Sequence, residues 1–340
     1  MKRILLAALA STALMAGSAQ AAEVELALSH RVPATHPLQP LGMEPWAKSI
    51  EEDSNGRIKI TIYPSQQLGA APDHYDMARD GIVDIAFINP GYQAGRFPII
   101  SAAELPFQAS NAKGGSRAVA EWYAKYAEKE MGDTYVCMVH FHDPGTIHSK
   151  EGPLAVPADL EGKNIRPPNG TMAQMFASLG AANVQVPAPE MRDALEKGTA
   201  DVTGSPWGSL FTFGIENTVK YHLDTPLYVT VFAFVMNKAK IDSLEPQDRE
   251  VIDNHCTPEW SEKMAAGWAD GEAAGRQKII DLGGHTLHKP NDEEMKLWRD
   301  AAAPMTEKWK EAAAKTGIDT DAALADLRDT LKKYDSLLDQ

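Results

Sequence analysis

A rigidly held arginine is the clearest chemical feature of this sequence. Arg166 ends a short strand-like run and is followed directly by Pro167 and Pro168. A guanidinium group stays charged at physiological pH, and its planar fork can form two parallel hydrogen bonds with a carboxylate. The same residue could instead form a salt bridge within its own fold. The spacing alone leaves both interpretations open, so the surrounding elements must decide between them.

Several other polar and aromatic side chains follow strand-like runs in the same way. Asn89 and Tyr92 lie in a loop behind an apolar strand, and Ser205 and Trp207 lie in a loop behind a later strand. Amide and hydroxyl groups can bind a polar ligand, and aromatic rings can wall a pocket. Asn89 could equally cap its own turn, and Phe232 could belong to the core. The full set of predicted ligand-binding residues is Arg166, Trp207, Asn89, Tyr92, His142, Arg31, His30, Ser205 and Phe232.

Three histidines, His140, His142 and His148, stand close together and offer the main competing chemistry. Two histidines that lie two residues apart at a strand end share one face, and such a pattern can ligate zinc in hydrolases. No carboxylate or cysteine joins them at the spacing of a metal site, and no phosphate-binding loop or nucleophile motif is present. We therefore expect no metal, no cofactor and no catalysis. An exported metal-dependent hydrolase that uses these histidines remains the alternative function.

The beginning of the chain and its composition indicate an exported protein. The chain has 340 residues and a formal charge of −14, and it opens with Lys2 and Arg3, an apolar run, and Ala19 and Ala21 at small-residue positions. This is the pattern of a cleaved signal peptide covering residues 1–21, which predicts a periplasmic location. An acidic protein of this kind disfavours nucleic acid as a partner. An anionic ligand would therefore need a local positive group.

Strand-like and helix-like runs alternate along the rest of the chain. Residues 57–63 show the period of two that is typical of a strand, and residues 82–88 form an apolar strand behind a helical pattern. This alternation predicts an α/β fold with largely parallel sheets, whose ligands bind beyond the carboxyl ends of the strands. Residues 71–85 and 188–202 repeat the same spacing of proline, acidic residues and glycine. The repeat indicates two lobes of similar construction that face a shared cleft.

Three further features complete the predicted organisation. Residues 230–236 form an uncharged strand suited to crossing between lobes, and residues 258–282 form one long helix that could brace both. Cys137 and Cys256 could pair in an oxidising periplasm or remain free thiols. The predicted domains are the signal peptide 1–21, lobe I with residues 22–146 and 233–275, and lobe II with residues 147–232 and 276–340, including C-terminal helices at 291–317 and 320–338.

Seven segments in this order resemble the extracytoplasmic solute-binding proteins of tripartite ATP-independent periplasmic (TRAP) transporters, the DctP-like family. They include LSHRVPATHPL, DIAFINPGYQAGRFP, LEGKNIRPPNGTMAQMFASLGA and DALEKGTADVTGSPWGSL. The resemblance covers nearly all of the mature chain and implies a two-lobed, periplasmic-binding-protein-like α/β clamp with a mixed, mostly parallel sheet in each lobe. It implies capture of a small organic acid and its delivery to the small and large membrane subunits of a TRAP permease. Arg166 falls where such proteins place the arginine that pairs with the ligand carboxylate.

The sequence departs from better-known members of that family at two points. Sialic-acid and dicarboxylate binders tend to carry Gln-Glu-Asn-Pro where this chain has residues 203–207, so their ligands cannot be carried over. Relatives with a Pro-Trp pair there often have an aromatic residue where this chain has Arg31, which could bind a second anionic group or face solvent. The ligand stays open among sugar acids, aromatic acids, keto acids, zwitterions and amines. We expect a monomer, and presentation of the ligand to a signalling partner is a further alternative.

Overall fold

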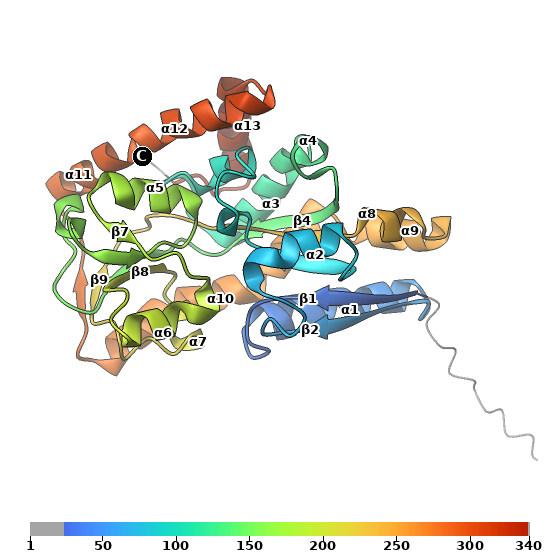
Figure 1. The fold of residues 1–340 in the computed structure, drawn as a ribbon, viewed down its shortest axis with the longest axis horizontal. Helices are drawn as coiled ribbons and strands as arrows, with labels where there is room; N and C mark the ends of the chain where they lie inside the picture. The colour runs from blue at the N-terminus through green and yellow to red at the C-terminus, as the bar shows by residue number, and fades with distance from the viewer. Residues whose placement is uncertain (1–23, 339–340) are drawn as a thin grey trace, which may run out of the picture.

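The strands form two separate sheets in the computed structural model, which describes residues 24–338 (Figure 1). The first sheet has the order β2-β1-β3-β10-β4 and the second has the order β11-β9-β5-β8-β6-β7. The strands of the first sheet are β1 (Val24–Ser29), β2 (Ile58–Tyr63), β3 (Ile85–Ile88), β4 (Tyr135–Phe141) and β10 (Val231–Met236). Those of the second are β5 (Thr146–Ser149), β6 (Asn164–Arg166), β7 (Ala182–Asn183), β8 (Val202–Ser205), β9 (Tyr221–Leu223) and β11 (Thr286–His288).

Both sheets are mixed. In each sheet the antiparallel strand, β10 in the first and β5 in the second, follows a strand of the other sheet in the chain. β1 runs parallel to β2 and β3, and β6 runs parallel to β7 and β8. β5 follows β4 across the junction and pairs antiparallel with β8 and β9. β10 follows β9 back across the junction and pairs antiparallel with β3 and β4. The predicted α/β class is confirmed, and the loops behind β1, β3, β6 and β8 all lie at carboxyl ends of parallel strands.

Helices cover the sheets and connect them (Figure 1). Those before the long central helix are α1 (Glu44–Asp53), α2 (His74–Arg79), α3 (Ala112–Tyr123), α4 (Ala127–Met131), α5 (Gly170–Ser178), α6 (Met191–Glu196), α7 (Ser209–Thr212), α8 (Lys238–Asp242) and α9 (Pro246–Asn254). They are followed by α10 (Pro258–Leu282), α11 (Asp292–Ala302), α12 (Pro304–Ala313) and α13 (Thr320–Lys333). No helix among residues 24–338 combines the length and apolar character needed to cross a membrane.

The long helix α10 has the bounds that the sequence predicts. The Thr257 side chain accepts a hydrogen bond from the Trp260 amide at its start, Pro258 occupies the first turn, and Gly283 follows its end with φ of 73°. The helix packs against α3 and β4 on the side of the first sheet and against α7 on the side of the second. It therefore connects the two sheets as predicted.

The predicted internal repeat is confirmed as a repeated structural unit. A short 3-10 helix, Ala71–Asp73, leads into α2 and then β3, and its counterpart, Ala188–Glu190, leads into α6 and then β8. Gly81 and Gly198 follow the two α-helices with φ of 73° and 72°, a conformation that glycine adopts at little cost. Each unit ends in a strand whose following loop faces the other sheet.

The predicted helix at 291–317 is divided in two. Pro304 begins α12 directly after α11 because proline lacks the amide hydrogen that would continue the first helix. The last helix, α13, packs against α3, and the Trp122 indole donates a hydrogen bond to the Ala323 carbonyl oxygen at 2.9 Å. The C-terminal helices therefore contact elements that lie against both sheets.

The two cysteines, whose state the sequence left open, form a disulfide. Cys137 of β4 is bonded to Cys256, which follows α9, across a sequence separation of 119. The bond lies in the core that packs between the first sheet, α1 and α9. It ties a strand next to the crossing strand β10 to the segment that leads into α10.

Candidate functional site

A cavity of about 420 Å³ lies where the loops of the two sheets meet. We call two parts of its lining the first-sheet wall and the second-sheet wall. The first-sheet wall consists of Arg31, Val32, His36, Asn89, Tyr92, His142 and Phe232. The second-sheet wall consists of Arg166, Pro168, Ala188, Met191, Gly204, Ser205, Pro206, Ser209 and Phe213, and the remaining lining residues are Tyr228, Thr230 and Trp268.

Arg166 is fixed by the backbone of the second-sheet wall. It ends β6 and is 4% exposed. Its Nε donates to the Val186 carbonyl oxygen at 3.1 Å, and its Nη1 donates to the Gly204 carbonyl oxygen at 3.2 Å. Within residues 24–338 it forms no ion pair, so the alternative that it salt-bridges its own fold is not supported. A buried, oriented and unpaired guanidinium is suited to binding an anion.

Arg31 enters the same cavity from the first-sheet wall. It follows β1, is 4% exposed, and its guanidinium carbon lies 4.6 Å from the ring centre of Phe87 and 4.7 Å from that of Phe232. Its Nε and Nη1 atoms are buried and have no hydrogen-bond partner among residues 24–338. Burial lowers the pKa of Arg31. Of the two possibilities that the sequence left open for Arg31, exposure to solvent is excluded.

Asn89 and Tyr92 connect the loop behind β3 to the second-sheet wall. The Tyr92 hydroxyl accepts a hydrogen bond from the Ala188 amide at 2.9 Å, and Asn89 Nδ2 donates to the Pro168 carbonyl oxygen at 3.4 Å. Gly91 allows this approach, because a Cβ there would lie 3.0 Å from the Cβ of Asn169. The two loops would have to separate before a ligand could enter between them.

Tyr92 also lies in the field of both arginines. Burial by itself raises the pKa of its hydroxyl, but the charges of Arg31 and Arg166 and the hydrogen bond from Ala188 act in the opposite direction. The net result is a lowered pKa for Tyr92. Its hydroxyl is consequently a better hydrogen-bond donor to an incoming anion than an ordinary tyrosine.

Two histidines of the first-sheet wall have defined and opposite roles. His36 Nδ1 accepts a hydrogen bond from the Leu38 amide at 3.1 Å, so the proton of the neutral ring is on Nε2, which has no partner among residues 24–338. His142 Nδ1 lies 2.6 Å from the Asp143 carbonyl oxygen, which makes Nδ1 the donor and leaves Nε2 as an acceptor. Burial lowers the pKa of His36 to about 3 and that of His142 to about 4, so both rings are neutral.

Two of the predicted site residues do not line the cavity. Trp207 packs its ring against His148 and His222, with ring centres 5.1 Å and 5.3 Å apart. His30 Nε2 lies 3.0 Å from Gln39 Oε1, in the interior next to β1. Arg31 and Pro206 line the cavity, whereas their sequence neighbours His30 and Trp207 do not. The other predicted residues are all in the lining.

Several lining residues that the sequence did not indicate come from the segment before β10, from α10 and from the end of α7. Tyr228 and Thr230 lie just before β10, Trp268 lies in the middle of α10, and Phe213 follows α7. The Tyr228 hydroxyl is buried without a partner among residues 24–338. Helical periodicity marks Trp268 only as a core residue, because the face of α10 that lines the cavity continues the face that packs in the core.

The predicted histidine cluster is dispersed. His142 faces the cavity, whereas His148 bonds to His222 at 2.7 Å between Nδ1 atoms, and His222 Nε2 lies 2.9 Å from His285 Nδ1. Among residues 24–338 no group of three His, Cys, Asp or Glu side chains is arranged to hold a metal ion. The described residues therefore give no support to the metal-dependent hydrolase.

Known proteins resemble this chain along most of its length. The sequence profile of the bacterial extracellular solute-binding proteins of family 7, named DctP, matches residues 28–312. A TRAP solute-binding protein from Rhodoferax ferrireducens in complex with benzoate is 33% identical with a TM-score of 0.86, covering 92% of this chain and 98% of that chain.

Two further solved structures show the same likeness. One is a marine metagenome TRAP solute-binding protein specific for aromatic acid ligands, in complex with 3-hydroxybenzoate, which is 33% identical with a TM-score of 0.86 over 93% of this chain and 100% of that chain. The other, from Bordetella bronchiseptica, holds (R)-mandelate and (S)-mandelate and is 30% identical with a TM-score of 0.86 over 91% of this chain and 99% of that chain.

Proposed function

This chain belongs to the bacterial extracellular solute-binding proteins of family 7, and we propose that it is a TRAP receptor whose ligand is an aromatic carboxylate held by Arg166. The observation that carries this proposal is the state of Arg166. Its guanidinium is buried, oriented by two carbonyl oxygens, and without an ion pair among residues 24–338. A carboxylate is the partner that its remaining donors fit best.

The aromatic part of the proposal rests on the rings of the lining. Tyr92, Phe213, Tyr228, Phe232 and Trp268 all border the cavity. Flat apolar rings pack favourably against a flat apolar ligand, whereas a sugar acid would require a hydrogen-bond partner for each hydroxyl. The relatives that hold benzoate, 3-hydroxybenzoate and mandelate agree with this choice.

The remaining parts of the proposal follow from membership of the family. The receptor acts in the periplasm, after export by the predicted signal peptide 1–21, which lies outside the described residues. It acts as a monomer, performs no chemistry on its ligand, and delivers it to the small and large subunits of a TRAP permease. A clamp of this kind has lobes that open and close, and we propose the boundaries 22–146 with 233–275 for lobe I and 147–232 with 276–340 for lobe II. These boundaries place α13 in lobe II, although α13 packs against α3, which belongs to lobe I.

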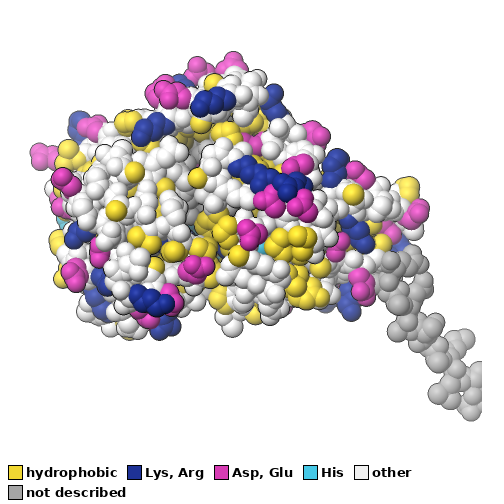
Figure 2. Space-filling view, in the orientation of Figure 1, with side chains coloured by type: hydrophobic (Ala, Val, Ile, Leu, Met, Phe, Trp, Pro, Cys, Tyr) yellow, Lys and Arg dark blue, Asp and Glu magenta, His cyan; other side chains and the backbone are white. Residues whose placement is uncertain are grey.

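The net charge of the protein does not supply the attraction for an acid. The formal charge is −14, and Figure 2 shows acidic and basic side chains interspersed over the visible face. The long-range field is therefore unfavourable to an anion, and the attraction must come from the buried arginines. Closure of the lobes excludes water and strengthens the pair between Arg166 and the carboxylate.

A thermal-shift panel followed by isothermal titration tests the proposal. Benzoate, 3-hydroxybenzoate, mandelate, glucuronate and choline are compared, and a ligand present at 100 times its dissociation constant should stabilise the protein by about 2.7 kcal/mol. We expect aromatic acids to be the strongest ligands and Arg166→Ala to abolish their binding. Arg96→Ala is the matched control, since Arg96 pairs with Asp76 outside the cavity. Wild-type affinity in Arg166→Ala, or stronger binding of glucuronate than of every aromatic acid, would refute the proposal.

A further inference from the structure

We propose that the ligand carries two negatively charged groups on a flat ring, one bound by Arg166 and the other by Arg31. This inference rests on the proposed function and makes its ligand class narrower. It concerns the same cavity but a different residue, on the opposite wall.

The charges around the cavity do not balance. Its lining contains two arginines and neither an aspartate nor a glutamate, and neither Arg31 nor Arg166 forms an ion pair among residues 24–338. Both arginine residues are 4% exposed. A buried charge without a counter-charge is strongly unfavourable, so a ligand with one negative charge would leave one cation uncompensated in the closed cavity.

The carboxylate behind the lining is already engaged elsewhere. Glu272 of α10 accepts hydrogen bonds from the Ser209 amide at 2.9 Å, from the Ser209 hydroxyl at 2.5 Å and from the Trp268 indole at 2.6 Å. These bonds join α10 to α7 and fix two lining residues. Burial raises the pKa of Glu272 to about 6, and no ion pair joins it to Arg31 or Arg166.

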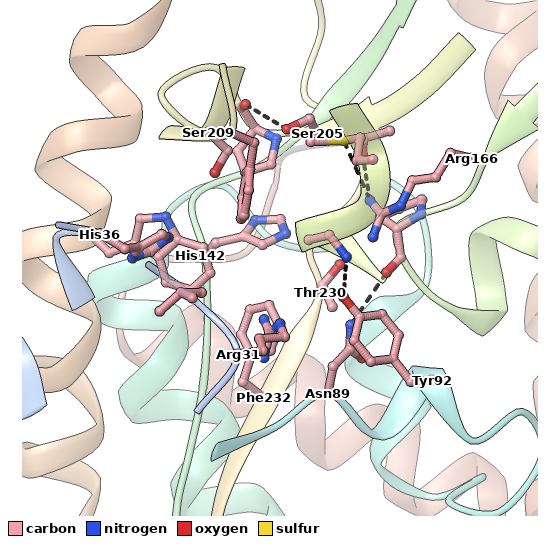
Figure 3. A pocket seen from close by; sticks show the side chains of 18 of the residues that line it. Arg31, His36, Asn89, Tyr92, His142, Arg166, Ser205, Ser209, Thr230 and Phe232 are labelled. Atoms are coloured by element: carbon pink, nitrogen blue, oxygen red, sulfur yellow. Dashed lines mark hydrogen bonds between the residues drawn. The ribbon is translucent and has the colours of Figure 1, made fainter. Parts of the chain in front are cut away.

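The two arginines enter from different walls and point to different groups. Figure 3 shows Arg31 beside Phe232 and Arg166 beside Ser205, with Tyr92 near both. A carboxylate that lies in the fork of Arg166 directs both of its oxygens towards the second-sheet wall. The free Nε and Nη1 donors of Arg31 therefore require another acceptor, carried elsewhere on the ligand.

Arg31 does not stand alone as a donor on the first-sheet wall. His36 lies on the same loop behind β1, is also without a partner on its protonated Nε2, and has its pKa lowered further by the charge of Arg31. Two unpartnered buried donors on one loop form a second anion-binding position. The rings of Phe87 and Phe232 hold the Arg31 guanidinium in place, so that its donors are oriented before the ligand arrives.

Isothermal titration with simple probes tests this inference. Benzoate is compared with benzene-1,2-, benzene-1,3- and benzene-1,4-dicarboxylate, for the wild type and for Arg31→Met, which keeps an unbranched apolar stem and removes the charge. We expect at least one dicarboxylate to bind the wild type 10-fold or more tightly than benzoate. In Arg31→Met that dicarboxylate should lose 100-fold or more in affinity, while benzoate should change by less than 5-fold, so the preference is reversed.

Arg96→Met is the control, because Arg96 also lies against two rings, those of Tyr75 and Phe97, but outside the cavity. It should leave every affinity unchanged, and thermal melting of both variants verifies that they are folded. Equal losses of benzoate and dicarboxylate in Arg31→Met would overturn the inference, as would a wild type that binds benzoate more tightly than all three dicarboxylates. In either case the proposed function stands as long as benzoate binds through Arg166, whereas failure of every acid to bind would refute the function itself.

Discussion

Arg166 is fixed by two backbone carbonyl oxygens on the side of the second sheet, whereas Arg31 packs against the neighbouring rings of Phe87 and Phe232 on the side of the first sheet. A carbonyl that accepts from a guanidinium occupies one of its donors and sets its direction. A ring that packs on the guanidinium face stabilises the charge and leaves every donor in the plane free. An arginine on one wall is therefore fixed in one direction, whereas the arginine on the other wall has its Nε and Nη1 donors without a partner among residues 24–338.

This difference suggests separate tasks for the two walls. The carbonyl-fixed arginine of the second-sheet wall determines where an acid group lies, and the ring-held arginine of the first-sheet wall determines which acids are accepted.

Low pH should destabilise the fold around both walls, because each wall is surrounded by buried neutral histidines. Burial lowers the pKa of His30 to about 4, His36 to about 3, His140 to about 3, His142 to about 4, His148 to about 4 and His222 to about 2. Their unfolded forms take up protons below about pH 6.5, so stability is lost as the pH falls from there towards the folded pKa values. Each histidine loses about 1 kcal/mol between pH 6.5 and 5.5, because its unfolded form is only half protonated at the start of this interval, so all six together lose roughly 6 kcal/mol.

Glu104 opposes this trend but cannot offset it. Burial raises its pKa to about 8, so its contribution to stability grows as the pH falls from about 8 to its unfolded value near 4.5. Chemical denaturation at a series of pH values measures the net effect of the histidines and Glu104 on the free energy of unfolding. We expect the free energy of unfolding to fall steeply below pH 6.5, and a flat profile down to pH 5 would show that these rings are not buried in neutral form.

The disulfide reinforces only the first-sheet wall. Replacing Cys137 and Cys256 by alanine opens a bond across a sequence separation of 119 and should lower the free energy of unfolding by about 2–5 kcal/mol. Neither residue lines the cavity, so the affinity for the acid should stay within about twofold of the wild type. Urea denaturation and isothermal titration measure the two quantities, and a large loss of affinity would mean that the first-sheet wall depends on the bond for its shape.

Lysine substitutions should distinguish the contributions of the two arginines to ligand affinity. Arg166→Lys loses the fork and both carbonyl contacts, so we expect a loss of affinity of about 1.5–3 kcal/mol, or roughly 10-fold to 150-fold. Arg31→Lys keeps the charge and loses ring contact, which should weaken binding by about 0.5–1 kcal/mol. Titration of both variants with one aromatic acid makes the comparison, and equal losses would contradict the division of tasks.

Tyr92→Phe should have the smallest effect. It removes the hydroxyl that accepts from the Ala188 amide across the two walls, which is worth about 0.5–1.5 kcal/mol. The dissociation rate of the acid should rise by about 2-fold to 13-fold in stopped-flow measurements, because the contact closes the cavity. Tyr63→Phe, at the end of β2 and outside the lining, should leave the rate unchanged.

Local patterns predicted the elements that carry the site, but not which side of each element faces it. The period of two in residues 57–63, the proline and glycine bounds of α10 and the repeated units before β3 and β8 are local signals, and all are confirmed. Arg31 and Ser205 face the cavity while His30 and Trp207 do not, because the direction of a side chain in a loop depends on long-range packing. Trp268 and Tyr228 meet the other lining residues only in three dimensions.

The exchange of one strand between the sheets has a consequence for the order of assembly. β4 joins the first sheet only through β10, which follows the first five strands of the second sheet in the chain. The N-terminal half of the chain is synthesised first, yet it cannot complete its own sheet until residues 231–236 are available as well. A chain halted before that point would present an unpaired β4 to its surroundings, so maturation of this protein must proceed as a single event rather than lobe by lobe.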